Sequence, residues 1–507
     1  MPLEALTQAD FDFYKNYAKQ MVDTHEKEFL QKAKPDLVRA FYRGRNKKED
    51  EKGIYGQNID SREHFLTLSR LFQGSNTILP NLMYQMPREM AIPLRGADAD
   101  GAALMTAALT FYSKLNNAKE ENQEAIMNTW FFGLGWKKLG YRTVFMPKVQ
   151  EPESDLGPMQ KFGQQVKSFL GIKPDNNESK ERPEIVDYET LFNNSESPMN
   201  VMVDHKADLR NSKAILHRLK RTVYDLQNFG DYDEAGLKEI VEKSRYQNGS
   251  RLETREMDVT LNELHIQQRN GIWILSWCDE YHKALRYEKS TYQGKGFSFI
   301  PLVFTNEPGV RYPISHMKVA TQVQEHIDYM ATIYIRILDH VRNQIILNQK
   351  ILSPGQLEAV RANKIGGIIL TDKPISKADY AQLTSAPVQN DLPNFIQTMV
   401  QNVTEIMGTD EQIIAGRSKN KTLGQDEIAR LGTQIREGGM LDKVRDFITK
   451  QARIEAVLLK EYSNAELHLQ ITGKDYSDRL TGQSVEEKWA EFMTEANPLG
   501  LKHYLDG

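Results

Sequence analysis

Residues 315–347 read SHMKVATQVQEHIDYMATIYIRILDHVRNQIIL, and this stretch decides the fold of the chain. No glycine or proline interrupts it, and its apolar side chains recur every three or four residues. That period predicts one amphipathic helix, which at 1.5 Å per residue is roughly 45–50 Å long. A stripe this narrow needs a packing partner, either the rest of a helix-rich domain or a neighbouring copy of the same helix. The stripe consists of Ala320, Val323, Ile327, Met330, Tyr334, Ile337, Val341 and Ile345.

The opposite face of this predicted helix is polar. A turn-rich connector, residues 306–309, and Pro313 precede the helix, so Ser315 is expected to cap its first turn. The polar face carries Lys318, Gln322, Glu325, Asp328, Arg336, Asp339 and Arg342.

A second amphipathic helix is predicted over residues 390–408. Asp391 is a suitable cap, Pro393 is tolerated in the first turn, and Gly408 ends the pattern. Its stripe consists of Leu392, Ile396, Met399, Val403 and Ile406. The intervening residues 348–389 combine short apolar runs, turn residues and one short helical segment, which predicts a small α+β module. The order of helix, module and helix predicts a hairpin with a decorated tip.

A polar loop and a second long helical region follow the hairpin. The loop, residues 409–424, carries Arg417, Lys419 and Lys421 at alternating positions. The helical pattern begins at residue 425 and runs to about Tyr462. The Gly438-Gly439 pair is expected to kink it, because each glycine weakens a helix by about 1 kcal/mol relative to alanine.

Helices and strands are mixed in the remainder of the chain. Helical patterning is expected in residues 1–50, 62–72, 102–136, 213–228 and 233–246. Strand patterning is expected in residues 140–145, 185–188, 199–204 and 466–471 and in several runs between 256 and 304, whereas residues 79–87 read as an extended, proline-bounded segment. The fold class predicted from these patterns is α+β and predominantly helical.

The amino-acid composition argues against several classes of protein. The chain has 507 residues, enough for two to four domains, and its net charge of −4 gives no global nucleic-acid signature. The single cysteine, Cys278, excludes an intramolecular disulfide and favours a reducing compartment. Residues 1–28 lack the apolar core of a signal peptide, and no apolar run is long enough for a transmembrane helix, so no membrane association is expected.

Motifs that carry catalytic chemistry are absent from the sequence. We find no Walker A motif, GxSxG elbow, HExxH, CxxC or EF-hand loop. His316, His326 and His340 lie on the predicted helix at separations that do not suit metal ligation. We therefore expect no catalytic residue, no metal site and no cofactor, and the chain is expected to be a scaffold rather than an enzyme.

The order of these segments resembles that of tailed-bacteriophage portal proteins, the head-to-tail connectors. The segments that carry the resemblance are residues 81–87, EIVDYE at 184–189, VMVD at 201–204, FIPLVF at 299–304 followed by Asn306, the hairpin at 315–407, and the basic loop with its kinked helix. The likeness is architectural and covers nearly the whole chain, and it rests on no single motif.

The resemblance implies a division into the parts of a portal subunit. Residues 1–314 would form a wing of mixed α/β structure, with a polar excursion at 148–183. The stem would comprise 315–347 and 390–408, and the clip 348–389. A tunnel loop at 409–424, a tunnel helix that returns to the wing at 425–475, and a short crown-like tail at 476–507 would complete the subunit.

It also implies a function and partners. Portal proteins form a homo-oligomeric ring of twelve at one capsid vertex, and double-stranded DNA is packaged and ejected through the ring without being read for sequence. The ring docks the packaging terminase and a tail adaptor, and contacts the major capsid and scaffolding proteins. The expected location is therefore the virion, and the host cytoplasm during assembly.

Three groups of residues take roles under this resemblance. Arg417, Lys419 and Lys421 would make transient contacts with DNA phosphates; the alternative is an ordinary solvated loop. Packing between subunits in the stem would use Val323, Ile327, Met330, Tyr334, Ile337, Val341, Leu392, Ile396, Met399 and Val403, with the polar face toward the channel or solvent. Contacts of the clip with terminase or adaptor would use Lys350, Arg361, Lys364, Lys373 and Lys377, unless these are simple surface charges.

Two other functions stay open at this point. One is a different self-assembling virion protein of the capsid or tail. The other is a metal-dependent nuclease that uses scattered carboxylates such as those of Asp279-Glu280 or Asp426-Glu427.

Overall fold

The computed structural model confirms the α+β class. Helices hold 57% and strands 20% of the part that it describes, and each sheet is antiparallel. The described residues are 6–43, 68–84, 87–93, 99–145, 186–209, 211–229, 232–233, 235–240, 258–279, 281–292, 294–340, 344–347, 380–383, 391–408 and 423–462.

The chain divides into two compact units. The first comprises Met1–Ala33, Asn81–Ser315 and Glu437–Gly507, and the second comprises Lys34–Pro80 and His316–Arg436. The division therefore falls at the start of the stretch 315–347. The second unit includes Lys34–Pro80, which the sequence-based division had grouped with the rest of 1–314.

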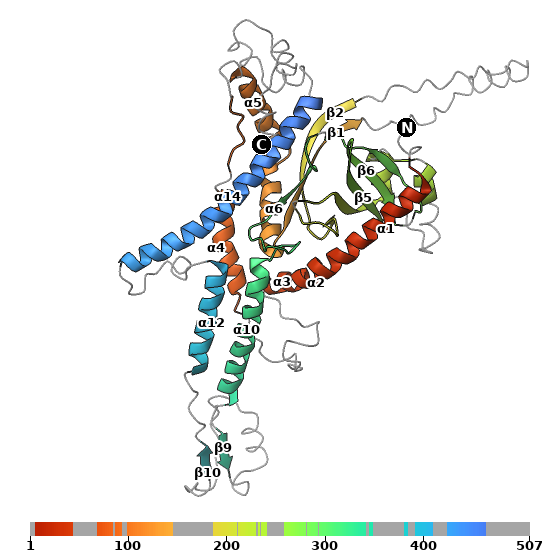
Figure 1. The fold of residues 1–507 in the computed structure, drawn as a ribbon. Coiled ribbons are helices and arrows are strands. Elements are labelled where there is room, and N and C mark those ends of the chain that lie inside the picture. Colours follow the sequence, from red (N-terminus) through yellow and green to blue (C-terminus); the bar gives the residue numbers. More distant parts are fainter. Residues whose placement is uncertain are drawn as a thin grey trace, which may run out of the picture. The chain divides into compact units, whose positions relative to one another are not determined.

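A five-stranded sheet is the largest sheet of the first unit (Figure 1). Its order is β3-β4-β5-β6-β7, so neighbours in the sheet are neighbours in the chain. The strands are β3 Val201–Val203, β4 Ala214–Thr222, β5 Asp258–Gln268, β6 Gly271–Cys278 and β7 Arg286–Lys289.

Helix α1, Gln8–His25, covers one face of this sheet; η2, Glu26–Leu30, and α2, Gln31–Ala33, continue it. Phe11, Ala18 and Met21 are buried in one cluster with sheet residues such as Leu264 and Trp277. Because this burial repeats every three to four residues on the helix and every two on the strands, both elements place one apolar face in a shared core.

The predicted helix at 213–228 is wrong over most of its length. Residues 214–222 form strand β4, and helix α8, Val223–Phe229, begins only after it. A helix was predicted because Leu216, Leu219 and Val223 are spaced with a helical period. Both faces of the first half of β4 are buried, so the alternation of polar and apolar residues that marks a half-buried strand is missing.

A second sheet of the first unit has three strands in the order β2-β1-β8. Its members are β1 Gly135–Phe145, β2 Val186–Glu196 and β8 Phe299–Leu302. Two helices precede β1: α5, Ala99–Leu115, and α6, Ala118–Phe132, whose second half is buried. The single helix predicted for 102–136 is thus two helices, since Asn117 adopts a left-handed conformation with φ of 49° and breaks the run.

Helix α4, Arg70–Tyr84, overturns the extended segment predicted at 79–87, at least as far as Tyr84. Pro80 lies inside this helix, where it costs about 3 kcal/mol. Leu71, Ile78 and Leu82 are each at most 2% exposed and lie on one helical face. Burying such side chains contributes about 1.5–3 kcal/mol each, which outweighs the cost of the proline. One of the segments that carried the family resemblance is therefore helical.

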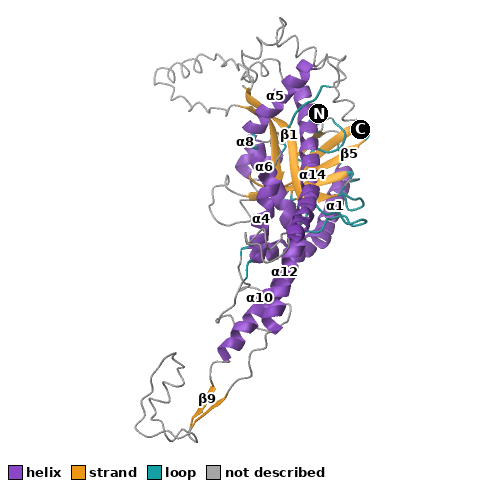
Figure 2. Cartoon of the chain, turned by 90° about the vertical axis from the view of Figure 1, so that its left-hand side faces the viewer, coloured by secondary structure: helices purple, strands orange, loops and turns teal. Residues whose placement is uncertain are grey.

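The second unit is built on two long helices that lie side by side (Figures 1 and 2). These are α10, His316–His340, and α12, Asp391–Met407; α3, Pro35–Tyr42, also packs on α10. Gly408 follows α12 with φ of 76° and ends the helix as predicted. The Ser315 hydroxyl, just before α10, donates to the carbonyl oxygens of Trp130 at 3.0 Å and Phe131 at 2.6 Å.

The helix predicted for 315–347 is too long. Helix α10 ends at His340, and Gln344–Leu347 forms strand β9, which pairs antiparallel with β10, Tyr380–Leu383. The β-branched Ile345 and Ile346 favour a strand, and the partner strand that stabilises it comes from distant sequence. The small module therefore contains a two-stranded sheet, although β10 was not predicted and the predicted strands at 350–352 and 366–370 lie outside the described residues.

Helix α14, Leu423–Tyr462, ends where the sequence predicts. It stays helical through Gly438 and Gly439, so the glycine pair does not break it. In the described part of the chain, none of the helices is both long and apolar enough to cross a bilayer.

Candidate assembly surface

One face of α10 is closed within the second unit, and half of it is polar. The buried residues lie on consecutive turns of the helix and form a single stripe. They are Met317, Ala320, Thr321, Gln324, Ile327, Asp328, Ala331 and Thr332, each at most 4% exposed.

Gln324 and Asp328 hold the start of α4 against this face. The backbone N–H of Leu68 donates to Asp328 Oδ1 at 3.0 Å, and Gln324 Nε2 donates to the Leu68 carbonyl at 2.7 Å. Gln324 Nε2 also lies 2.7 Å from Asp328 Oδ1, one helical turn away. The expectation that Asp328 lies on an open polar face is therefore wrong, because its carboxylate satisfies backbone that would otherwise be buried without a partner.

Burial sets the charge state of this carboxyl. It raises the pKa of Asp328 to about 6, although the Leu68 N–H and the Gln324 amide favour the charged form. Below about pH 6 the carboxyl is thus mainly neutral, and Oδ2 has no hydrogen-bond partner among the described residues. The closed face of α10 is consequently a polar contact with a titratable group at its centre.

The junction of α4, α10 and α12 is packed closely. A Cβ at Gly74 would lie 3.1 Å from Met407 Cε, so the absence of a side chain lets α4 approach α12. The Ser75 hydroxyl donates to Met317 Sδ at 3.3 Å. At the end of α12, Arg436 Nη1 donates to the Glu405 carbonyl at 2.9 Å. These contacts fix the base of the hairpin.

The predicted packing residues divide into closed and open positions. Ile327 and Val403 are buried inside the chain at 0% and 1% exposure. Six others are only half-buried: Val323, Met330, Tyr334, Leu392, Ile396 and Met399. Val319 and Phe395, which the stripes did not include, are each 42% exposed. The side chains of Ile337 and Val341 lie outside the described residues.

The hairpin therefore carries a row of apolar side chains that its own unit covers only in part. We call the six half-buried residues, with Val319 and Phe395, the open stripe. Exposed apolar side chains spread along two helices are typical of an interface with another chain. Sequence periodicity found most of this surface but could not separate it from the closed face.

The two predicted basic groups cannot be placed. Arg417, Lys419 and Lys421 lie outside the described residues. So do the residues predicted to contact terminase or adaptor, which are Lys350, Arg361, Lys364, Lys373 and Lys377.

A buried polar network in the first unit was not predicted. Lys137 on β1 is 0% exposed, and its Nζ donates to Asn122 Oδ1 on α6 and, at 2.9 Å, to Gln451 Oε1 on α14. Gln451 Nε2 in turn donates to Glu89 Oε1 at 2.9 Å and to Glu455 Oε1 at 3.1 Å. The network thus ties α14 to the three-stranded sheet and to α6.

The carboxyls of this network share one positive charge. Burial raises the pKa of Glu89 to about 9, the neighbouring Glu455 adds to the shift, and Lys137 opposes it. Burial also lowers the pKa of Lys137 to about 8 against the pull of both carboxylates. At neutral pH we therefore assign a neutral carboxylic acid at Glu89 and a lysine that is mainly charged. The signal in the sequence was Gln451 and Glu455 at i and i+4 within an otherwise apolar helical stripe.

A second charged cluster joins the two sheets of the first unit. Lys138 Nζ lies 2.6 Å from Glu263 Oε2, and His217 Nε2 lies 3.0 Å from Glu196 Oε2. Burial alone would raise the pKa of Glu263, but Lys138, His217 and His265 together outweigh it and hold that pKa well below its usual value. Burial lowers the pKa of the adjacent His265 to about 3. This cluster is a structural core held by ion pairs and hydrogen bonds, although His265 Nε2 has no hydrogen-bond partner among the described residues.

Neither cluster has the composition of a metal centre. In the part of the chain that the structure describes, no three side chains of histidine, cysteine, aspartate or glutamate come together in a way that could hold a metal ion. No protein-family model matches the sequence, and a comparison with curated proteins gives no match.

Proposed function

We propose that this protein is a portal-type subunit that assembles into a ring. The ring would form a channel at one capsid vertex, through which double-stranded DNA is packaged and ejected. It would also dock the terminase, tail adaptor, and capsid and scaffolding proteins. The proposal joins the order of segments in the sequence to one structural observation, the open stripe on α10 and α12.

The open stripe supports self-assembly for a physical reason. When two apolar side chains meet across an interface, each Å² of apolar surface that leaves water stabilises the assembly by about 25 cal/mol. The closed face of α10 is occupied by α4 and by hydrogen bonds of Gln324 and Asp328, so it is not free for another chain. The open stripe is therefore the part of the hairpin available to a neighbouring copy. In a ring the contact is heterologous, so the stripe would meet a different surface of the next subunit.

The experiment is to measure the mass and shape of the purified protein. Light scattering coupled to size-exclusion chromatography gives the mass, and negative-stain electron microscopy gives the shape. A ring of fixed subunit number with a central channel supports the proposal. A monomer at micromolar concentration, or an assembly without a channel, overturns it.

A single substitution tests the surface itself. Met330→Asp places a charge on the open stripe at a half-buried position, and we expect loss of the ring with retention of the folded subunit. Gln322→Asp, which adds the same charge at an exposed position of α10, is the matched control. Ile327 is unsuitable, because it is 0% exposed and a charge there would unfold the hairpin.

The role of the basic loop is tested separately. Neutralising Arg417, Lys419 and Lys421 together should leave the ring intact and alter DNA packaging or retention. An unchanged packaging yield would remove their assigned role in contacting DNA.

The open stripe also suits a second candidate of the same class, another self-assembling virion protein of the capsid or tail. The micrograph separates the two candidates: a closed ring with a channel favours the portal, whereas sheets, shells or filaments favour the alternative.

A further inference from the structure

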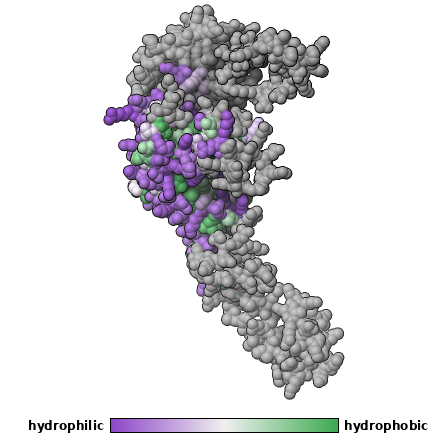
Figure 3. Space-filling view, turned by 90° about the vertical axis from the view of Figure 1, so that its right-hand side faces the viewer, coloured by the Kyte–Doolittle hydropathy of each residue, from purple (hydrophilic) through white to green (hydrophobic). Residues whose placement is uncertain are grey.

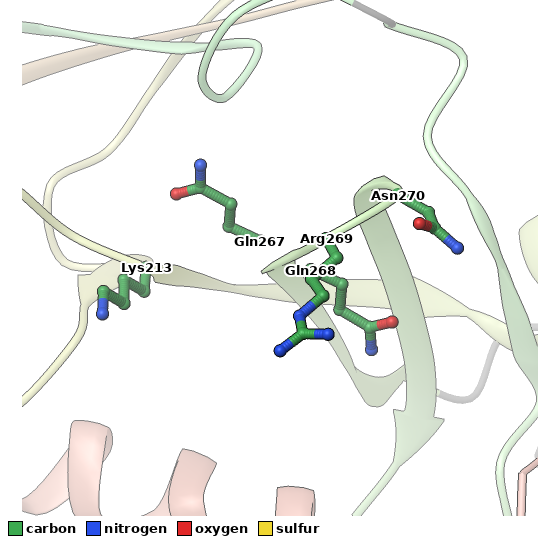
Figure 4. Close-up of a pocket in the computed structure, with 5 residues that line it drawn as sticks. All are labelled: Lys213, Gln267, Gln268, Arg269 and Asn270. Carbon is green, nitrogen blue, oxygen red and sulfur yellow. The ribbon is translucent and has the colours of Figure 1, made fainter.

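A cavity of about 600 Å³ opens beside the β5–β6 hairpin of the first unit (Figure 4). It is lined by Lys213, Gln267, Gln268, Arg269 and Asn270. Gln268 pairs with Gly271, so Arg269 and Asn270 form a tight turn between the strands, and Gly271 takes the φ of 120° that this turn needs. Lys213 is placed alongside because its carbonyl accepts the backbone N–H of Gln267 at 2.9 Å.

Positive charge and amide groups dominate this cavity. Its lining holds one lysine, one arginine and three amide side chains, and no acidic residue. Lys213 and Arg269 are exposed, and neither is ion-paired to another described residue. Figure 4 shows the side chains of Lys213, Gln268 and Arg269 pointing to the same side of the strands, toward the helix drawn in pale red, which by its colour is α1.

An exposed aromatic ring lies next to the cavity. Gln268 Nε2 lies 3.4 Å from the Tyr14 hydroxyl and 3.2 Å from that of Tyr287, which links the hairpin turn to α1. The Tyr14 ring is 5.4 Å from the ring of Phe13, which is 64% exposed. The described surface on the side seen in Figure 3 is mainly hydrophilic, with small, separate apolar patches. Phe13 thus offers an exposed apolar ring that is linked, through Tyr14 and Gln268, to a cavity with two exposed cations.

We propose that the cavity and Phe13 together bind an acidic segment of another protein that carries an apolar side chain. Its carboxylates would pair with Lys213 and Arg269, and the amide oxygen of Gln268, which points to the same side, can accept a hydrogen bond from its backbone. Its apolar side chain would cover Phe13. This inference does not depend on ring formation, and no predicted site residue belongs to this surface.

The chemistry favours an acidic peptide over nucleic acid. Non-specific DNA binding is built from many phosphate contacts, typically 6–10 for a strongly salt-dependent protein. This cavity offers two cations on a chain whose net charge is −4. Two cations with the Gln268 amide and one aromatic ring instead match a short segment with a few carboxylates and one hydrophobic anchor.

The test uses the full-length protein and a fluorescein-labelled hexaglutamate peptide that carries one phenylalanine, with binding followed by fluorescence anisotropy. Wild type should bind it, and the Lys213→Glu/Arg269→Glu variant should bind at least about tenfold more weakly, since one decade in affinity corresponds to about 1.4 kcal/mol. Phe13→Ala should weaken binding by about threefold to tenfold, the loss expected for an aromatic contact worth roughly 0.5–1.5 kcal/mol. Lys220→Glu/Arg221→Glu, which reverses two exposed charges at the other end of β4, should leave the affinity within about twofold.

Three results would overturn the proposal. One is a wild-type protein that does not bind the peptide. A second is equal loss of binding in the cavity variant and in the Lys220/Arg221 control, because this shows general attraction between charges. The third is a labelled DNA duplex that binds more tightly than the peptide and loses affinity in the cavity variant. Circular dichroism and the thermal midpoint of each variant confirm that the fold is retained, and the chromatographic mass measured alongside separates a failure here from a failure of ring assembly.

Discussion

Two helices of this protein each bury a glutamine together with an acidic side chain one turn later, but in different surroundings. On α14, in the first unit, Gln451 donates to Glu455 one turn later at 3.1 Å; on α10, in the second unit, Gln324 donates to Asp328 one turn later at 2.7 Å. The α14 pair meets a buried cation, Lys137, whereas the α10 pair meets the backbone of Leu68. The difference shows that a buried acid can be compensated by a counter-charge or held by hydrogen bonds from backbone and amide donors.

Removing the counter-charge should have the largest effect. Lys137→Met leaves Glu89 and Glu455 without their counter-charge and removes a donor to Gln451. We expect a loss of about 3–5 kcal/mol in the free energy of unfolding, the usual cost of breaking a buried ion pair on one side. The measurement is urea denaturation followed by circular dichroism. Lys119→Met, at an exposed position of α6, is the control and should change stability by less than about 0.5 kcal/mol.

A double variant sharpens this prediction. Lys137→Met/Glu455→Gln removes the acid together with the cation, so it should recover part of the loss caused by Lys137→Met. If the single variant costs less than about 1 kcal/mol, or if the double variant is the less stable of the two, Lys137 is not the counter-charge of the network.

Substitutions in the Gln324–Asp328 pair of α10 should cost less stability. The loss should depend on whether an acceptor oxygen remains in place rather than on its charge. Asp328→Ala strips the acceptor from the Leu68 N–H and the Gln324 amide, and should destabilise the protein by about 1–3 kcal/mol. Asp328→Asn keeps an acceptor oxygen in place, so at pH 7 it should cost clearly less. Equal losses in the two variants would contradict the hydrogen-bonding role that the distances assign to Asp328.

The sequence predicted the existence of this hairpin but not which of its faces is closed. Periodicity identified α10 and α12, since apolar side chains at i, i+3 and i+4 report an amphipathic helix whatever its partner. It placed Asp328 on the open side, because a carboxyl is normally exposed and the backbone that it satisfies, at Leu68, lies 260 positions away. Lys137 was missed for the same reason: its partners Asn122, Gln451 and Glu455 meet only in the folded chain.

Two segments that were predicted to be helical form strands, because each pairs with a strand that the local sequence does not reveal. Residues 214–222 match a helical period, yet pairing with β5 and burial of both faces make them a strand. Gln344–Leu347 continued the helical stripe of α10, yet these residues pair with Tyr380–Leu383. Strand propensity depends strongly on context, so such segments are ambiguous until the partner is known.

The pH dependence of stability should separate the two buried acids further. The folded-state pKa of Asp328 is raised from 3.8 to about 6, so the stability that it contributes is present below pH 3.8 and is lost as pH rises through 6. The corresponding window for Glu89 extends from 4.5 to about 9. His265 and His25, whose pKa values burial lowers to about 3 and about 4, act in the opposite sense and lose stability as pH falls below 6.5.

These windows give a measurable profile. Between pH 6.5 and 8, Glu89 with its neighbour Glu455 dominates among these groups, because the histidines are already neutral and Lys137, with a pKa of about 8, starts to release its proton only at the upper end. Urea midpoints should therefore fall with rising pH in that range, and Glu89→Gln should flatten the slope. Asp328→Asn should change the profile only below about pH 6. A Glu89→Gln profile that is parallel to wild type would exclude the raised pKa.

The smallest change in stability is expected at Gly438 and Gly439 of α14, where a new side chain would contact nothing. Gly438 and Gly439 are helical, and a Cβ built on either meets nothing within 4 Å. Alanine at each position should thus stabilise the protein by about 0.5–1 kcal/mol, because it reduces the freedom of the unfolded chain and improves helix propensity. Gly408→Ala is the matched control and should destabilise, since φ is 76° there and the new Cβ would lie 2.9 Å from Arg436 Cδ. A loss of stability at Gly438 or Gly439 would mean that the folded protein needs the glycine pair for a conformation of α14 other than the continuous helix.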